Sequence, residues 1–288
     1  MQTKDYKAAL KNFYAWLEFT GKDDAAVYLS IANAYYELKD YANIIKPADK
    51  AIKLYADKQN QNPYILKVQS YYERKKYPET IEVLETLVKI FPDTKQWWVQ
   101  LAQFYILVED YDKGAYTLDL AYKQGILDKE SQINTLASLY RQLEVPYKAA
   151  KLLEKNIESG LIKRDDKNIT TLANSWHSAQ HIGKAAKYFG ELAKMTNEAK
   201  HYRKQGALLQ QDEQFSKSVV ALKKALELGI KDKGKIHMDI AVCYFYLEKY
   251  KKAYSAIQLA MKDKSTRKYA KSWKTFIVDT ARRKNVAI

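Results

Sequence analysis

One pattern recurs seven times along the chain and constrains its fold more than any other feature. A bulky residue returns every 33 to 36 positions, and a small residue stands three positions before it in nearly every copy. A repeat of this length indicates stacked supersecondary units, each resting on its neighbours, in place of one globular core. The bulky residues are Tyr35, Tyr71, Tyr105, Tyr140, Trp176, Leu209 and Tyr244; the small ones are Ala32, Val68, Ala102, Ala137, Ala173, Gly206 and Ala241.

A second pair of positions in each copy predicts a second helix. A mostly small residue is followed four positions later by a mostly large one, which suits a helix that crosses its neighbour closely and fills the gap to the next unit. Two helices in about 34 residues match the tetratricopeptide repeat (TPR). The predicted fold is all-α, a right-handed α-solenoid of TPR helix-turn-helix repeats. The residues are Ile44, Thr80, Gly114, Ala149, Ala185, Ser218 and Ala253, then Ala48, Leu84, Leu118, Leu153, Phe189, Leu222 and Ile257.

The repeats predict a single solenoid over residues 1–288 with about sixteen helices, more than two-thirds helical residues and no strand. Residues 1–20 repeat the second-helix pattern with no first helix before them. They are either the remainder of a repeat cut from a longer protein or a native capping helix. Residues 266–283 predict a C-terminal capping helix with Tyr269, Trp273 and Ile277 along one face. The predicted repeats are 25–58, 61–94, 95–128, 130–163, 166–198, 199–232 and 234–267.

Proline and glycine agree with these boundaries, with one exception. Proline is tolerated in the first turn of a helix, and glycine commonly follows the last turn. Pro47 instead falls inside the second helix of the first repeat, where it predicts a kink near Ile44. The residues that agree are Pro63, Pro78 and Pro146 at helix starts, and Pro92, Gly125, Gly160 and Gly229 after helix ends.

First helices line the concave wall of a TPR array, so the repeat phase predicts which side chains face that wall. The expected surface combines apolar side chains with amides that can bond an extended backbone, which favours a peptide groove. The alternative is a wall that binds nothing specific. The predicted groove residues are Leu29, Asn33, Tyr36, Ile65, Gln69, Tyr72, Val99, Gln103, Ile106, Asn134, Ser138, Arg141, Thr170, Asn174, His177, Arg203, Lys204 and Met238.

Several more specific sites have little support. One TPR subclass grips a C-terminal carboxylate with Lys and Asn one turn apart, but the pair Leu29/Asn33 and its counterparts in the next two repeats lack the lysine. His177 and His181 are four residues apart, yet His181 falls in a turn and no Cys or carboxylate completes a metal set. Cys243 is the only cysteine and is expected to be buried. No phosphate loop or nucleophile motif occurs, so we expect neither an enzyme nor a cofactor.

Charge distinguishes the two halves of the chain. Residues 1–140 sum to about −1 and residues 141–288 to about +16, within a total of +15. We therefore expect a partner that is acidic where it meets repeats four to seven and uncharged where it meets repeats one to three. Such charges mainly speed and orient association. The alternatives are that the lysines only keep the protein soluble, that they bind RNA, or that they dock on anionic lipid.

Four stretches resemble the TPR proteins that gamma-proteobacteria encode beside the TonB–ExbB–ExbD machinery of outer-membrane iron uptake. They are Lys95–Tyr105, Gly125–Gly160, Asn168–Gln180 and Lys264–Lys274. The resemblance implies a scaffold or adaptor that serves this transport complex. It also implies a periplasmic protein whose signal sequence is absent from this chain; the alternative is a cytoplasmic one. No apolar stretch is long enough to span a bilayer.

Overall fold

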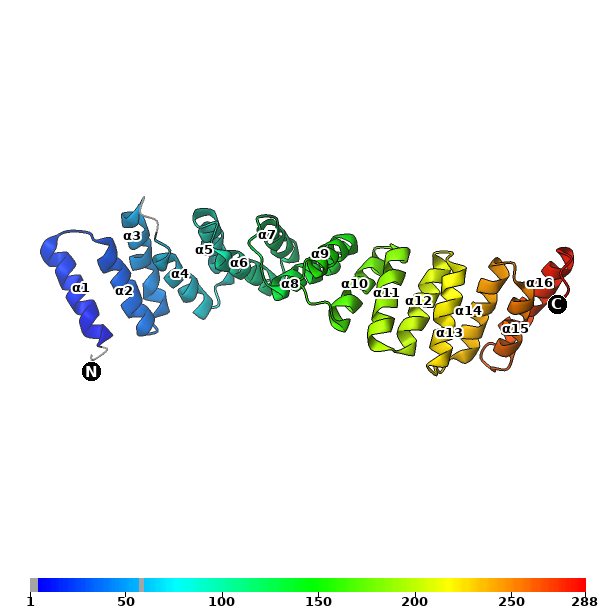
Figure 1. Cartoon of the computed structure of the whole chain (residues 1–288). Coiled ribbons are helices and arrows are strands. Elements are labelled where there is room, and N and C mark those ends of the chain that lie inside the picture. Colours follow the sequence, from blue (N-terminus) through cyan, green and yellow to red (C-terminus); the bar gives the residue numbers. More distant parts are fainter. Residues whose placement is uncertain (1–4, 57–59) are drawn as a thin grey trace. The chain divides into compact units, whose positions relative to one another are not determined.

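The computed structural model describes residues 5–56 and 60–288, and this part of the chain is all-helical (Figure 1). It contains sixteen α-helices and one 3₁₀ helix, and no strand occurs within the described ranges. Of the described residues 78% are helical, so the expected helix content is confirmed. The predicted ranges 1–20 and 25–58 extend into residues 1–4 and 57–58, which lie outside the described residues.

The chain folds as two compact units. Unit 1 is Met1–Asp128 and unit 2 is Lys129–Ile288. The boundary coincides with the predicted end of the third repeat at residue 128. The prediction of a single solenoid over residues 1–288 stays a prediction.

Unit 1 holds three helical hairpins preceded by one further helix, and each helix packs against the next. Aspartates cap several of these helices: the Asp24 side chain accepts from the backbone N–H groups of Ala26 and Val27, which would otherwise lack partners. The helices are α1 (Tyr6–Thr20), α2 (Ala25–Glu37), the 3₁₀ helix η1 (Tyr41–Ile44), α3 (Ile45–Tyr55), α4 (Asn62–Glu73), α5 (Tyr77–Ile90), α6 (Lys95–Leu107) and α7 (Tyr111–Lys123).

Unit 2 continues the same alternation through four hairpins and a final helix. Consecutive helices pack pairwise, and α11 packs against the next hairpin as closely as against its own partner α10. The helices are α8 (Glu130–Gln142), α9 (Pro146–Glu158), α10 (Asp166–Ser178), α11 (Ile182–Thr196), α12 (Ala199–Gln211), α13 (Phe215–Glu227), α14 (Lys233–Tyr246), α15 (Tyr250–Met261) and α16 (Arg267–Arg283).

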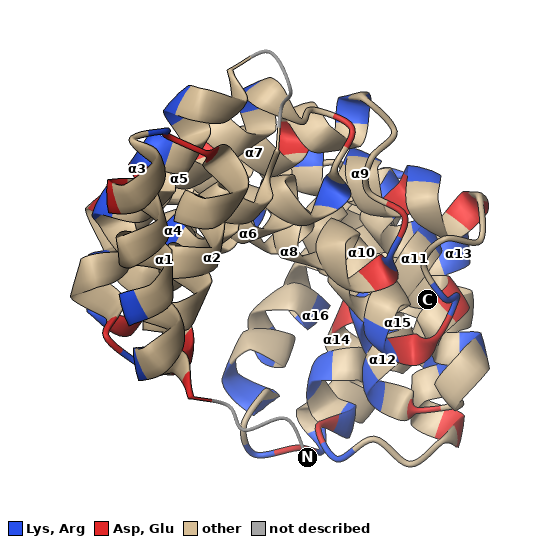
Figure 2. Cartoon of the chain, turned by 90° about the vertical axis from the view of Figure 1, so that its left-hand side faces the viewer, with Lys and Arg blue, Asp and Glu red and all other residues tan. Residues whose placement is uncertain are grey.

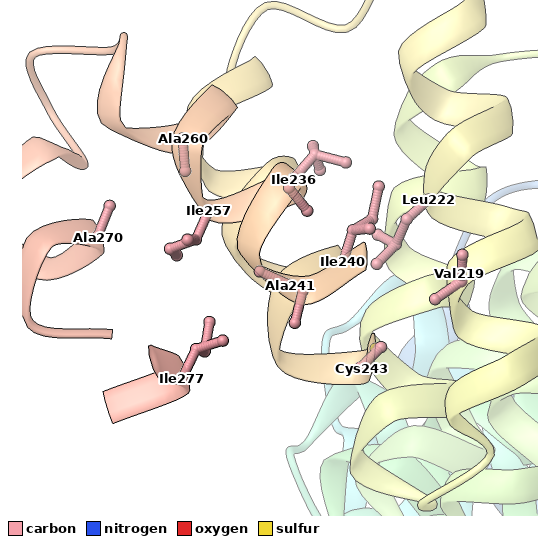
Figure 3. Packing of buried hydrophobic residues seen from close by; sticks show 12 residues of the cluster. Val219, Leu222, Ile236, Ile240, Ala241, Cys243, Ile257, Ala260, Ala270 and Ile277 are labelled. Carbon is pink, nitrogen blue, oxygen red and sulfur yellow. The ribbon is translucent and has the colours of Figure 1, made fainter. Parts of the chain in front are cut away.

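The small residues of the repeat lie where the helices meet. All fourteen of the predicted close-approach positions are buried, including Ala241 and Ala253 with no exposed surface. At Gly206 a Cβ would lie 2.6 Å from the Leu222 side chain, so no larger residue fits without displacing that leucine. Figure 3 shows Ile240, Ala241 and Leu222 converging in the core formed by α13 to α16. The predicted repeat phase is confirmed.

Pro47 lies in the first turn of α3 and not in a helix interior, and the change of helix type falls at Ile44, where the kink was expected. The second helix of the first repeat begins as a 3₁₀ turn that ends at Ile44 and becomes α-helical only at Ile45. Pro47 is therefore the third residue of α3, where its missing N–H has no partner to lose. Pro63, Pro78 and Pro146 lie in the first turns of their helices, and Gly125, Gly160 and Gly229 follow helix ends with positive φ.

Every hairpin turn contains one residue with a positive φ, and none of these residues is glycine. In the fourth repeat Glu144 has φ 57°; the following Val145 N–H donates to Tyr140 O at 2.8 Å. This arrangement is the Schellman closure of a helix, which usually employs glycine because a Cβ is strained there. The seven residues are Lys39, Lys75, Glu109, Glu144, Gln180, Glu213 and Glu248.

The two terminal helices depart in part from expectation. In α16 Ile277 is buried and Trp273 partly so, but Tyr269 is 68% exposed. The buried side of α16 is formed by Ala270, Ile277 and Ala281, because small residues allow α15 to approach. Helix α1 has no buried residue, and Trp16 of its predicted packing face is 41% exposed.

We expect Glu144→Gly to stabilise the protein by about 0.5–1 kcal/mol, because glycine relieves the strain of the left-handed turn. The same change at the exposed helical position Lys151 should destabilise it by about 1 kcal/mol. Chemical denaturation of both variants measures the difference. Destabilisation by both would show that the turn carries no such strain.

Candidate functional site

The eighteen predicted groove residues are all exposed or half-buried, but the structure places only some of them in hollows. Gln69, Tyr72 and Gln103 line one groove in unit 1, and Ser138 and Arg141 line another in unit 2. Others serve the packing of helices against one another. Leu29 and Tyr36 lie against the buried cluster that contains Ala32, Ile44, Ala48 and Leu66. Ile106 covers Gly114, since its Cγ1 lies 3.3 Å from where a Cβ there would stand.

The α4–α6 groove lies between the first helices of the second and third repeats. It has a volume of about 420 Å³. Its rim carries two apolar side chains that are about half exposed, Tyr72 at 51% and Leu107 at 52%. The Tyr72 ring meets Phe104 edge-on, with ring centroids 5.8 Å apart. The seven lining residues, none of them charged, are Val68, Gln69, Tyr72, Gln100, Gln103, Phe104 and Leu107.

One polar atom in this groove has no hydrogen-bond partner among the described residues. Gln100 Oε1 is buried, yet nothing donates to it. An unsatisfied buried acceptor costs about 1–3 kcal/mol, so such groups are rare in folded proteins. The atom is closed to solvent as it stands, and a ligand N–H reaches it only when the Gln100 side chain turns into the groove.

Helix α6 is held firmly on its other side, which fixes the groove wall. The indole of Trp97 donates to Gln61 Oε1 at 3.2 Å, and that of Trp98 donates to the carbonyl of Pro92 at 2.7 Å. The buried Tyr105 hydroxyl donates to Glu85. Burial and this hydrogen bond raise the pKa of Tyr105, so the hydroxyl keeps its proton across the physiological range.

Sequence reasoning identified one amide of this groove on α6 and missed the rest of that wall. Gln100, Gln103, Phe104 and Leu107 follow the spacing i, i+3, i+4, i+7, which is one continuous face of a helix. The prediction instead took Val99, Gln103 and Ile106 as the exposed face of α6, and part of that face is turned toward the neighbouring helix. Extending the stripe from Gln103 would have found the other three.

The α8–α10 groove of unit 2 occupies the equivalent place but has a different character. It has a volume of about 510 Å³ and is lined by Ser138, Arg141, Gln142, Glu144, Pro146 and Ser178. Its lining is mainly polar.

The predicted groove residue His177 lies on α10 and is half-buried. Burial together with nearby Lys204 lowers the pKa of His177, so its imidazole is neutral at pH 7.

Charged groove residues further along unit 2 already have partners. Arg203 Nη1 lies 3.5 Å from Asp232 Oδ2, and the Lys204 ammonium lies 5.8 Å from the centre of the Phe189 ring. His181 is the residue immediately before α11 and its side chain makes no capping hydrogen bond. Cys243 is fully buried, with its thiol 3.3 Å from Ser218 Oγ. Burial raises the pKa of Cys243, which leaves it a protonated thiol.

The described residues contain neither a candidate metal site nor a candidate membrane-spanning helix. No group of three His, Cys, Asp or Glu side chains is placed to hold a metal ion in residues 5–56 and 60–288. No helix of that part of the chain is both long enough and apolar enough to cross a membrane.

Several solved structures are similar to this chain. A chain of the Naa15/Naa10 complex bound to HypK-THB matches 88% of this chain with a TM-score of 0.61 and 14% identity; the match covers 39% of that chain. YrrB, described as a TPR protein with an unusual peptide-binding site, matches 64% of this chain and 93% of its own, with a TM-score of 0.43 and 16% identity. A TPR protein from Parabacteroides merdae ATCC 43184 matches 88% and 98%, with a TM-score of 0.41 and 11% identity.

The fold is that of the all-α TPR solenoids. At 14% identity the first of these similarities shows a shared fold and nothing further. This chain spans 39% of the length of that first match. No protein-family model matches the chain, and no curated protein matches it.

We expect Gln100→Leu to stabilise the protein by about 0.5–1 kcal/mol, because it removes a buried acceptor that has no donor. Gln103→Leu is the matched control: its amide is exposed in the same groove, and the change should stay within about 0.5 kcal/mol. Thermal and urea denaturation of both variants measure the two effects. A Gln100→Leu protein that unfolds earlier would mean that the amide oxygen has a partner in solution.

Proposed function

We propose that this protein is a non-catalytic interaction scaffold that holds a segment of another protein in the α4–α6 groove. The observation that carries this proposal is the buried, partnerless Gln100 Oε1 at an apolar hollow. An extended peptide supplies backbone N–H groups at regular intervals, and one of them completes the missing hydrogen bond once the Gln100 side chain turns into the groove.

The chemistry of the groove specifies the kind of segment. Tyr72 and Leu107 offer apolar surface at the rim, and the exposed amide of Gln103 can donate to a carbonyl and accept from an N–H. Because no lining residue is charged, burying a charged side chain here would leave it without a partner. The bound segment is therefore extended and carries apolar or uncharged polar side chains.

Selection from a display library of random peptides tests this proposal. Peptides that bind the full chain are expected to fall about tenfold in affinity with Gln100→Leu, the effect of one buried hydrogen bond. They should also weaken with Tyr72→Ala. The control is Gln258→Leu, which removes an exposed amide on α15. If every selected peptide binds all four proteins equally, the α4–α6 groove is not the binding site.

The resemblance to proteins encoded beside TonB–ExbB–ExbD gives a narrower proposal: the partner is a component of that transport system, and the protein acts in the periplasm. This proposal rests on the stretches Lys95–Tyr105, Gly125–Gly160, Asn168–Gln180 and Lys264–Lys274. The first of them contains Gln100. Calorimetric titration of wild type and Gln100→Leu with the purified periplasmic segments of such a system tests it. Absence of binding to each segment would contradict it.

A further inference from the structure

A further groove lies in unit 2, along helices α11, α12 and α13. Helices α11 and α13 both pack against α12, and a hollow of about 810 Å³ lies along all three helices. Because short turns join these helices, α11 and α13 run in the same direction. We name this hollow the α11–α13 groove. Its lining residues are Gly183, Ala186, Lys187, Lys194, Tyr202, Gln205, Leu209, Gln214, Lys217, Val220, Ala221, Lys223, Lys224 and Glu227.

Small and apolar residues form its floor. Ala221 and Leu209 are nearly fully buried there. At Gly190 a Cβ would lie 2.2 Å from Gln205 Nε2, so a larger residue there would displace the end of the flexible Gln205 side chain. Val220 stands on the rim with 69% of its surface exposed. A branched apolar side chain in that position gains stability from being covered.

Positive charge lines the walls and is largely unbalanced. Five lysines face one carboxylate, Glu227, which pairs with Lys224 at 3.1 Å. No ion pair to a carboxylate involves Lys187, Lys194, Lys217 or Lys223 within the described part of the chain. Ammonium groups beside a low-dielectric floor attract an anion more strongly than the same groups in open water.

The spacing of the lysines indicates how an occupant is arranged. Lys187 and Lys194 are seven residues apart on α11, and Lys217 and Lys224 are seven apart on α13. Seven residues are two helical turns, so the two lysines of α11 lie about 10 Å apart along their wall. In an extended chain this distance corresponds to about three residues. On α13 Lys224 is paired with Glu227, and the Lys217 ammonium donates to Gln214 Oε1 at 2.7 Å.

We propose that the α11–α13 groove binds an acidic segment of another protein, in which two carboxylates about three positions apart flank an apolar side chain. The carboxylates pair with the lysines of the walls, and the apolar side chain covers Val220 and the floor. A nucleic acid fits less well, because its phosphates would leave the apolar floor empty and the sole aromatic lining residue, Tyr202, is half-buried.

This surface belongs to unit 2, which carries 32 Lys and Arg against 16 Asp and Glu over residues 129–288. Figure 2 shows Lys and Arg recurring on the ribbon of its helices. The groove shares no residue with the α4–α6 groove. An experiment can therefore contradict either proposal without affecting the other.

The test uses the full chain and three matched peptide libraries. The first holds extended peptides with two Asp or Glu residues two to four positions apart and apolar residues between them. In the second, Asn and Gln replace the acidic residues; in the third, Ser and Gly replace the apolar ones. Binders are expected from the first library, and they should weaken about tenfold with the double change Lys194→Gln and Lys217→Gln, since each exposed ion pair contributes modestly.

Three controls complete the experiment. Lys251→Gln with Lys271→Gln removes the same charge from exposed positions on α15 and α16 and should change affinity less than about twofold. Val220→Ser should weaken binding about threefold, an effect that a purely electrostatic contact would not show. Gln100→Leu should change nothing. All these positions are exposed except Gln100, so folding is preserved.

Four results would overturn the proposal. One is a second or third library that yields as many binders as the first. Another is a loss of affinity from the α15 and α16 changes as large as that from the groove changes. The third is unchanged binding by Val220→Ser. The fourth is tighter binding of single-stranded RNA than of any peptide, together with a loss of RNA affinity in the Lys194→Gln and Lys217→Gln variant. That result would assign the groove to phosphate binding.

Discussion

The close approach of two helices at paired, mostly small residues is the constraint on which most of the described hairpins depend. Ala241 and Ala253 have no exposed surface, and at Gly206 even one additional carbon would reach the Leu222 side chain. Because the helices lie so near, the large residue one turn later reaches the following hairpin and fills the space between repeats. The stacking of neighbouring units thus follows from the size of a few side chains.

The turns show how this packing overrides local preference. All seven hairpin turns hold Lys, Glu or Gln in a left-handed conformation, where glycine is the easy choice. The strain persists because the helices on both sides are fixed by their packing, and the backbone between them has one way to close. Glycine is used instead after second helices, at Gly125, Gly160 and Gly229.

The two grooves illustrate how a repeat array separates function from fold. Helix packing depends on the residues where helices cross. The helix faces outside these contacts can differ from one repeat to the next. In unit 1 the leftover face carries uncharged amides and rings around a buried acceptor, Gln100. In unit 2 it carries lysines around an apolar floor. The same backbone therefore presents two surfaces of different chemistry.

Small residues such as Ala102 and Ala241 recur at intervals that helical packing explains, so the all-helical fold and the approximate number of helices could be predicted from the sequence. The sequence also predicted Gln69, Tyr72 and Gln103 as groove residues, and these three line the α4–α6 groove. Only the tertiary structure decided which neighbours share a hollow. Tyr36 and Ile106 occupy the same position in the pattern as Tyr72 but pack against neighbouring helices, whereas Gln100 faces a groove without a partner. A one-dimensional period gives the direction of each side chain on its own helix. What that side chain meets depends on the size of residues on other helices, which is a property of the packed array.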